Sequence, residues 1–179
     1  MSEKGMRAEL EYSGQNIESV IAEQGEVMTS TSGTSMYPML RHRRDMIRVV
    51  KLTRPLRRND VPHYRTKSGK LVLHRLLCVK PDGSYVIRGD NLYRRELNVT
   101  DDMIIGILSG FWRDGKFYDC EKSRAYHFYV IAMRAAYPFR YLWKMIIRPL
   151  LSKIKRQMSD MRSGKLCRIQ HPAHLISNI

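Results

Sequence analysis

The sequence predicts a mainly β, antiparallel fold with a short N-terminal helix and a basic, amphipathic helical region toward its C-terminal end. Two patterns carry this prediction in a chain of 179 residues. Between residues 27 and 120, short apolar and β-branched runs alternate with turn-forming residues, as in hairpins. On either side, apolar residues recur three and four positions apart, as in helices. We therefore expect an N-terminal helix within 1–26, a β-rich domain over 27–120, a basic helical region over 121–157 and a mobile tail over 158–179.

The N-terminal helix is expected over Asn16–Gln24. Its residues Ile17, Val20 and Ile21 form one apolar face. Gly25 follows, at the position where glycine commonly ends a helix. We interpret this helix as a packing element without chemistry.

The β-rich domain contains four clear strand patterns and three turn signals. The strands are expected over Met46–Leu52, Leu71–Val79, Ser84–Arg88 and Met103–Trp112. The turns are expected at residues 67–69, 81–83 and 113–115, each of which ends in glycine. Short connections between neighbouring strands favour an antiparallel arrangement.

The C-terminal third returns to helical spacing, with apolar residues from Tyr126 to Tyr137 recurring at the helical period. Pro138 and Pro149 interrupt this region, so we expect separate helical pieces rather than one continuous helix. Residues 158–179 show no clear period, which is the basis for expecting a mobile tail there.

The charge balance limits the classes of function. The chain has 32 Lys and Arg against 17 Asp and Glu, a net charge of +15, which favours nucleic acid or an anionic lipid surface as a partner. An inert basic surface is the alternative. A hydrophobic content of 43% argues against disorder, and no apolar run is long enough for a signal peptide or a membrane span. The three cysteines form no paired motif, so we expect no metal and no organic cofactor.

The sharpest local feature is the segment Ser32–Leu40, in which a small, turn-prone run is followed by Met36 and Pro38. Gly33 allows a tight turn and Pro38 fixes the exit of the chain, so the bend can hold the hydroxyl of Ser35 toward a cleft. A serine becomes a nucleophile at neutral pH only beside a base. Without one, Ser35 is an ordinary loop serine.

His74 is the candidate base. Strand alternation puts Val72, His74 and Leu76 on one face, where burial lowers the pKa of the imidazole and keeps it neutral. A carboxylate on its other nitrogen would set the tautomer, and Asp90 in the run 88–91 is the candidate. The alternatives are a core histidine with one hydrogen bond and an ordinary Asp-Asn turn.

These segments, taken in order, resemble the signal peptidase I/LexA-like serine peptidases. The resemblance rests on the Ser-Met-x-Pro box at 35–38, the box at 72–77 and the Gly-Asp-Asn box at 89–91, and it covers about residues 27–112. It implies a β-rich fold with the active site along a strand-lined groove. It also implies that Ser35 is the nucleophile, that His74 is the general base where bacterial members have lysine, and that Asp90 either orients His74 or balances its charge.

The resemblance also bears on the oxyanion site and on a structural turn. Bacterial signal peptidases carry a serine two residues before the nucleophile, and this chain has Gly33 there. The oxyanion would then be bound by the backbone N–H of Ser35 and by a group of Ser32 or Thr34. Asp60 matches an aspartate that is structural in relatives.

Two basic segments could recognise partners. Residues 41–58 hold eight basic residues and one acid, and they could dock an acidic peptide or form a solvated rim. Residues 122–157 hold nine basic residues, no acid and many aromatic and aliphatic side chains, which is typical of a helix on an anionic membrane. The residues expected at that surface are Arg134, Arg140, Trp143, Lys144 and Arg148. Nucleic-acid binding is less favoured, because no DNA- or RNA-binding motif is present.

The sequence therefore predicts a serine endopeptidase of signal-peptidase-like type that cleaves a peptide or protein through an acyl-enzyme on Ser35, with His74 as base. We expect it to be cytoplasmic and peripheral, at the inner face of a membrane. The first alternative is a β domain that binds a peptide without cleaving it and is tethered to lipid. The second is a LexA-like regulator. The substrate and the oligomeric state stay open.

Overall fold

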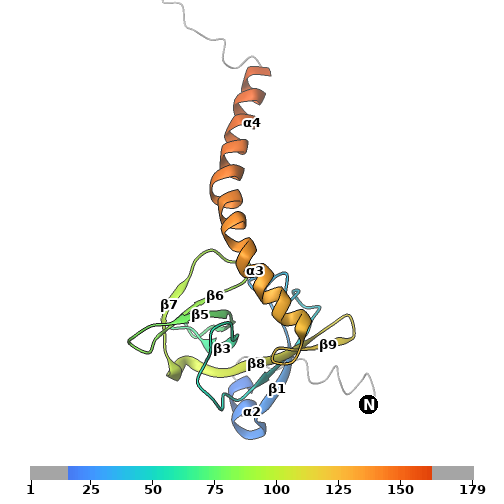
Figure 1. Ribbon diagram of the computed structural model, residues 1–179, viewed down its shortest axis with the longest axis vertical. Helices are drawn as coiled ribbons and strands as arrows, with labels where there is room; N and C mark the ends of the chain where they lie inside the picture. The colour runs from blue at the N-terminus through green and yellow to red at the C-terminus, as the bar shows by residue number, and fades with distance from the viewer. Residues whose placement is uncertain (1–15, 163–179) are drawn as a thin grey trace, which may run out of the picture. The chain divides into compact units, whose positions relative to one another are not determined.

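The structure is a computed structural model that describes residues 16–162 (Figure 1). These residues divide into two compact units, one ending at Arg134 and the other beginning at Ala135. The strands all belong to the first unit and are β1 (Glu26–Ser30), β2 (Met46–Val50), β3 (Pro62–Arg65), β4 (Leu71–Leu73), β5 (Arg75–Val79), β6 (Tyr85–Arg88), β7 (Glu96–Val99), β8 (Ile104–Arg113) and β9 (Lys116–Asp119). The helical elements are α2 (Asn16–Gln24), the single 3₁₀ turn Asp101–Met103, α3 (Arg124–Leu142), the π-helical turn Trp143–Ile147 and α4 (Arg148–Arg162).

The predicted fold class is confirmed, because every strand pairing in the two sheets is antiparallel. The larger sheet has the order β1-β2-β8-β3-β4, with β9 also paired to β8, and the smaller sheet has the order β5-β6-β7. The ten-residue strand β8 is the spine of the larger sheet, because it pairs with β2, β3 and β9.

The strand predicted over Leu71–Val79 is in fact two strands in different sheets. β4 pairs with β3 in the larger sheet, and β5 pairs with β6 in the smaller one. His74 is the single residue between them, so the chain changes sheets at the candidate base. The predicted alternation of faces is wrong here, because His74, Arg75 and Leu76 are all buried in succession. Alternation holds only within one continuous strand.

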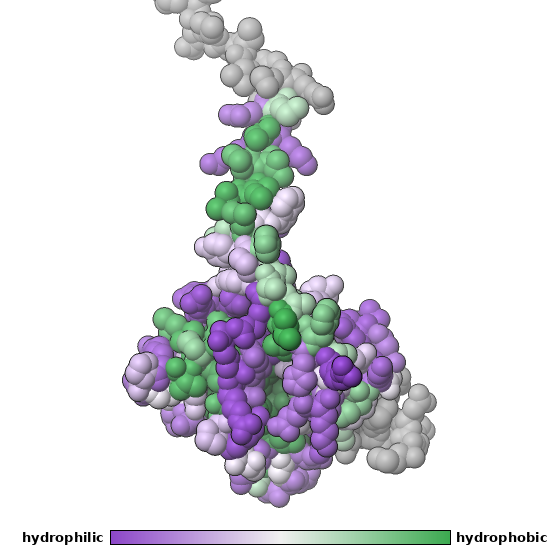
Figure 2. Space-filling view, viewed as in Figure 1, coloured by the Kyte–Doolittle hydropathy of each residue, from purple (hydrophilic) through white to green (hydrophobic). Residues whose placement is uncertain are grey.

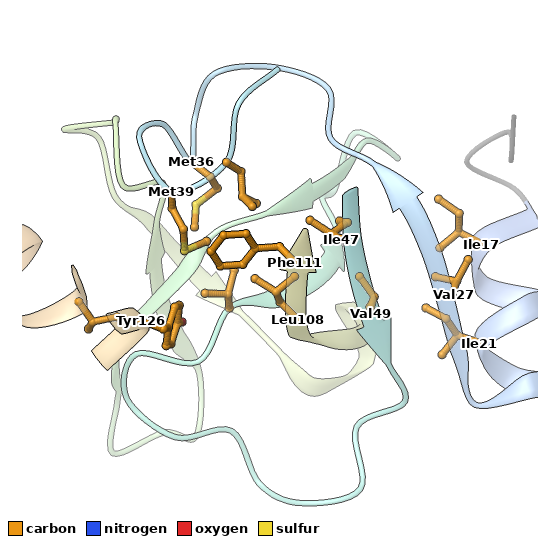
Figure 3. Close-up of a cluster of buried hydrophobic side chains, with 13 residues drawn as sticks. Ile17, Ile21, Val27, Met36, Met39, Ile47, Val49, Leu108, Phe111 and Tyr126 are labelled. Atoms are coloured by element: carbon orange, nitrogen blue, oxygen red, sulfur yellow. The ribbon is translucent and has the colours of Figure 1, made fainter. Parts of the chain in front are cut away.

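Each sheet covers its own apolar cluster. The first cluster packs α2, the larger sheet, the loop after β1 and the start of α3 around Val49, Leu108 and Phe111. Met36 and Met39 lie against Phe111 in this cluster (Figure 3). The second cluster packs Tyr64 of β3 against Leu76 and Ile87 of the smaller sheet. The tyrosine therefore bridges the two sheets.

The helix α2 has the predicted bounds and the predicted end. Ile17 and Ile21 are buried in the first apolar cluster. Gly25 has a φ of 79° and its N–H donates to the carbonyl of Ile21 at 3.0 Å. The left-handed backbone is the reason that glycine ends this helix.

The prediction that prolines would separate the C-terminal helices is wrong. α3 continues through Pro138, and α4 begins with Arg148 and Pro149 directly after the π-helical turn. Proline removes a single hydrogen bond, here to the carbonyl of Arg134, and the two units divide at this same residue. Pro149 is the second residue of α4 and lies directly after the π-helical turn.

The boundaries of the C-terminal region also differ from the prediction. Tyr126 and Val130 belong to the first apolar cluster, so the β-rich unit extends to Arg134 rather than ending at 120. Residues 158–162, expected in a mobile tail, are the last turn of α4, and the rest of that tail lies outside the described residues. Among the helices described, none combines the length and the apolarity that crossing a bilayer requires.

Candidate active site

The loop between β1 and β2 carries Ser35. It is held before Ser35 by a hydrogen bond of Gly33 and after Ser35 by buried apolar side chains. Met36, Met39 and Leu40 are buried in the first apolar cluster, which leaves Ser35 half-buried and Thr34 exposed. Gly33 has a φ of 94°, and its N–H donates to Nδ1 of His42 at 2.8 Å. The sequence folds this way because small residues form the turn and large apolar ones fix its exit in the core.

The Gly-Asp-Asn segment after β6 meets this loop directly. The backbone N–H of Asn91 donates to the carbonyl of Ser35 at 2.8 Å, and the side-chain amide of Asn91 donates to the carbonyl of Thr34 at 3.1 Å. Segments more than fifty residues apart in the sequence therefore form one site. Asn91, which the sequence analysis did not single out, holds the backbone of the candidate nucleophile.

Gly89 lies where the candidate nucleophile and base come together. A Cβ atom at this position would lie 2.6 Å from the carbonyl oxygen of Ser35 and 3.1 Å from Nε2 of His74. The first distance is far inside van der Waals contact, so only glycine fits without displacing the loop. Because both groups approach the same point, the Nε2 edge of His74 and the backbone of Ser35 share one small space.

His74 is held at its other nitrogen by two side chains that the sequence analysis did not identify. Nδ1 lies 3.0 Å from Oε1 of Glu96 and 3.2 Å from the hydroxyl of Tyr64. Tyr64 in turn donates to Oε2 of Glu96 at 2.7 Å. Tyr64 comes from β3 of the larger sheet and Glu96 from β7 of the smaller one, so the cluster spans the seam between the sheets.

This arrangement selects one tautomer of the neutral imidazole. A carboxylate oxygen only accepts hydrogen bonds, so the ring proton belongs on Nδ1 and the lone pair on Nε2. Burial also raises the pKa of Tyr64, as does its bond to Glu96, so the phenol remains a donor. Among the described residues, no group is hydrogen-bonded to Nε2. This nitrogen lies beside Gly89, next to which the backbone carbonyl of Ser35 also lies.

The pKa of His74 is lowered from its ordinary value, as predicted. Burial is the main cause, and the charge and hydrogen bond of Glu96 oppose it without reversing it. The ring is 4% exposed. His74 is therefore neutral at pH 7 and able to accept a proton at Nε2.

The hydroxyl of Ser35 makes no hydrogen bond with His74, nor with any other group in residues 16–162. Catalytic hydrogen bonds are often long before substrate binds and shorten in the complex. The backbone N–H of Ser35 also donates to no group within this range, so it can donate to an oxyanion. The N–H of Gly33 is already bonded to His42, whereas Ser32 and Thr34 are exposed beside the loop.

Asp90 does not have the predicted orienting role, because that position on Nδ1 of His74 is occupied by Glu96. Both carboxylate oxygens of Asp90 face Arg75, at 2.8 Å from Nε and 2.7 Å from Nη2. Tyr129 of α3 also donates to Asp90 at 3.0 Å. The charge of Asp90 still raises the pKa of His74, though less than that of Glu96. Asp90 thus balances charge near the base while bonding to Arg75.

Arg75 ties the start of α3 to this site. Its Nη1 donates to the hydroxyl of Tyr126 and to the carbonyl of Asn59, each at 2.9 Å. Arg134, predicted at the membrane surface, belongs to the first unit and donates to the side chain of Asn59 at 3.4 Å. The remaining predicted membrane residues, Arg140, Trp143, Lys144 and Arg148, lie in the second unit.

The basic segment 41–58 is partly neutralised. Arg41 pairs with Asp45 and Asp114, Arg48 with Glu26, and Arg54 with Asp60 and Glu121. Asp60 also accepts from the backbone N–H of Arg57 at 2.7 Å, which agrees with the structural role expected for it. In residues 16–162, no group of three or more His, Cys, Asp or Glu side chains is arranged to hold a metal ion.

Comparison with known protein families gives no matching family, and comparison with curated proteins gives no significant match.

Proposed function

We propose that this protein is a serine endopeptidase of signal-peptidase-like type, with Ser35 as nucleophile, His74 as general base and Glu96 as the carboxylate that orients the base. Its substrate is a peptide or protein with small residues at the cleavage site, as the sequence resemblance implies. The observation that carries the proposal is the state of His74. Nδ1 is held by Glu96 and Tyr64, and the unbonded Nε2 faces the Ser35 backbone across Gly89.

The reaction follows from these positions. Nε2 of His74 accepts the hydroxyl proton as Oγ of Ser35 attacks the scissile carbonyl carbon, and the backbone N–H of Ser35 donates to the resulting oxyanion. The imidazolium, stabilised by Glu96, then gives its proton to the leaving amine, and an acyl-enzyme remains. Water, deprotonated by Nε2, hydrolyses the ester and frees Ser35.

A membrane surface is the proposed place of action. Residues 135–159 carry six Lys and Arg and no Asp or Glu, next to exposed aromatic and aliphatic side chains. Each cation near an anionic lipid surface contributes about 1 kcal/mol, so six suffice for reversible attachment. The protein would then be peripheral, at the cytoplasmic face.

Peptide cleavage by matched variants tests the chemistry. A quenched fluorescent peptide library with small residues at the central positions serves as substrate. We expect Ser35→Ala and His74→Ala each to lower the rate by at least about 10³-fold, because the nucleophile and its base act as one unit. Tyr37→Phe, at an exposed position of the same loop, is the control and should retain most of the activity. A variant of Ser35 that cleaves at the wild-type rate would contradict the proposal.

A peptide-binding domain without hydrolysis is the second candidate. It is favoured by the lack of a hydrogen bond between Ser35 and His74 among the described residues, and by Gly33 where a second oxyanion hydroxyl would be. Such a protein would bind members of the peptide library without releasing fluorescence. Ser35→Ala would then leave its affinity unchanged and would have no activity to remove.

A further inference from the structure

The second unit carries a long run of exposed apolar side chains. In α3 after Arg134, in the π-helical turn and in α4, eight large apolar residues besides Tyr141 and Met145 are between 43% and 74% exposed. They are Phe139, Leu142, Trp143, Ile146, Leu150, Leu151, Ile154 and Met158. Figure 2 shows green side chains gathered along this segment, with purple ones beside them. We refer to these eight residues, together with the half-buried Ile147, as the apolar stripe.

In an uninterrupted α-helix the apolar stripe would drift around the helix axis. Each α-helical residue turns by about 100°, so Leu142 and Ile154, twelve positions apart, would point about 120° apart. Phe139 and Met158, nineteen positions apart, would likewise point about 100° apart. In an uninterrupted α-helix the mean directions of the apolar residues before and after the turn would therefore differ by about 85°, and the stripe would spread over about half of the helix circumference.

The π-helical turn removes this mismatch. The N–H of Arg148 donates to the carbonyl of Trp143, five residues earlier, so this turn holds one residue more than an α-turn. Every later residue falls back by about 100° relative to a plain α-helix. Leu142 and Ile154 then point within about 20° of each other, and Phe139 and Met158 point in nearly the same direction. The mean directions of the two groups then agree to within about 15°, and the spread of the eight exposed residues narrows from about 180° to about 120°.

The same shift collects the basic residues. Arg140, Lys144 and Arg148 share one side of the helix, and Lys153, Lys155 and Arg156 extend the polar side along α4. All six flank or oppose the apolar stripe, and residues 135–159 contain no acidic side chain. Long basic side chains at the flank of an apolar face can reach lipid headgroups while the face itself enters the acyl region.

We propose that the π-helical turn Trp143–Ile147 joins the apolar faces of α3 and α4 into a single stripe that lies in the plane of an anionic membrane. The inference rests on the membrane attachment proposed above and is independent of the chemistry at Ser35. Charge decides among the partners. A second copy of residues 135–159 would place like charges together, because this segment contains no acidic residue. Nucleic acid would pair with the basic side chains but would leave the apolar stripe exposed to water. An anionic bilayer accommodates the apolar and the basic faces together.

Binding of the full chain to phosphatidylcholine vesicles with about 30% phosphatidylserine tests the inference. Three variants are compared: deletion of Met145, which lies off the stripe, insertion of one alanine between Ile147 and Arg148, and both changes together. The deletion removes the extra residue and leaves a plain α-helix with the same stripe, so it should bind within about 2-fold of wild type. The insertion rotates the face of α4 away and should bind at least about 10-fold more weakly. The double variant should recover.

Each opposite outcome overturns a stated part of the inference. If the deletion is as harmful as the insertion, the π-helical turn does not set the stripe. If the insertion binds like wild type, charge alone holds the protein. If wild type does not bind these vesicles, the membrane is the wrong partner. In that case, a change in the sedimentation coefficient of the insertion variant, measured without vesicles, would indicate that the stripe forms an interface between helices of two chains. Cleavage of a soluble peptide by all three variants, and vesicle binding by Ser35→Ala, separate this result from the peptidase proposal.

Discussion

Two adjacent residues, His74 and Arg75, each contact a carboxylate, Glu96 and Asp90 respectively. The two contacts differ in how many of the side chain's nitrogens are hydrogen-bonded. Arg75 is 3% exposed, and its guanidinium is bonded to both oxygens of Asp90, to Tyr126 and to Asn59. His74 is almost as deeply buried, but only Nδ1 is bonded, to Glu96 and Tyr64. All three nitrogens of the Arg75 guanidinium are hydrogen-bonded, whereas Nε2 of His74 has no hydrogen bond among the described residues.

The difference separates a satisfied ion pair from a side chain that can still accept a proton. A buried pair with all of its donors satisfied has no capacity for a substrate and is costly to break. A histidine held at one nitrogen by a carboxylate has a set tautomer and a basic second nitrogen. The chain changes sheets at residue 74. There His74 contacts Glu96 and Tyr64, whereas Arg75 contacts Asp90 and Tyr126.

The largest expected effect is on stability, from Asp90→Ala. The substitution leaves the charge of Arg75 buried without its main partner, so we expect the free energy of unfolding to fall by about 3–5 kcal/mol. Urea denaturation followed by fluorescence measures this change. Glu96→Ala is the matched control, because Glu96 is 36% exposed, and it should cost less than about 1 kcal/mol. Equal losses from both variants would contradict the contrast.

The next effect is on turnover, from Glu96→Gln. The amide cannot hold the Nδ1 proton as a carboxylate does, so we expect kcat to fall about 100-fold with little change in stability. The charge and hydrogen bond of Glu96 raise the pKa of His74, so the variant should also shift the acid limb of the kcat/KM profile to lower pH. A limb that does not move would mean that Glu96 does not act through His74.

A smaller effect is expected from Gly89→Ala. The added Cβ would lie 2.6 Å from the carbonyl oxygen of Ser35, so the loop must move away from His74. We expect kcat to fall about 10-fold and the free energy of unfolding to fall by about 1–3 kcal/mol. Steady-state kinetics and urea denaturation measure the two changes. Unchanged kinetics would show that the approach at Gly89 has no part in the reaction.

The smallest effect is expected from Tyr64→Phe. The variant removes the hydrogen bond to Glu96 and the 3.2 Å contact with Nδ1 of His74, and it leaves the contact between Glu96 and Nδ1 in place. We expect kcat to fall a few-fold, roughly as one hydrogen bond of about 1 kcal/mol implies. The same kinetic assay measures it. A loss larger than that of Glu96→Gln would make the tyrosine, rather than the carboxylate, the group that orients His74.

The sequence predicted what depends on neighbours along the chain. The bounds of α2 and its glycine end follow from local spacing and composition, whereas His74 is buried as predicted although the alternation used to predict it does not hold. Glu96 could not be found in this way, because it reaches His74 from another strand across the seam between the sheets. Asp90 has the expected place beside the nucleophile loop, but the neighbouring Arg75 competes for it.

The helical region shows the same limit. A proline removes one backbone hydrogen bond from a helix, so Pro138 predicted a break. The helix α3 nevertheless continues through it. The π-helical turn is also invisible to a search at one fixed helical period, since the apolar residues on its two sides fall out of phase. The turn brings the mean directions of these residues from about 85° apart to about 15° apart.

The most direct test of the central claim is whether Ser35 becomes acylated in a reaction that needs His74. A fluorophosphonate probe, read by intact mass and peptide mapping, measures this without knowledge of the substrate. We predict a single adduct on Ser35 in wild type, none in Ser35→Ala, and labelling at least about 100-fold slower in His74→Ala, because the hydroxyl then lacks its base. No adduct in wild type, or one that forms equally fast without His74, would contradict the account.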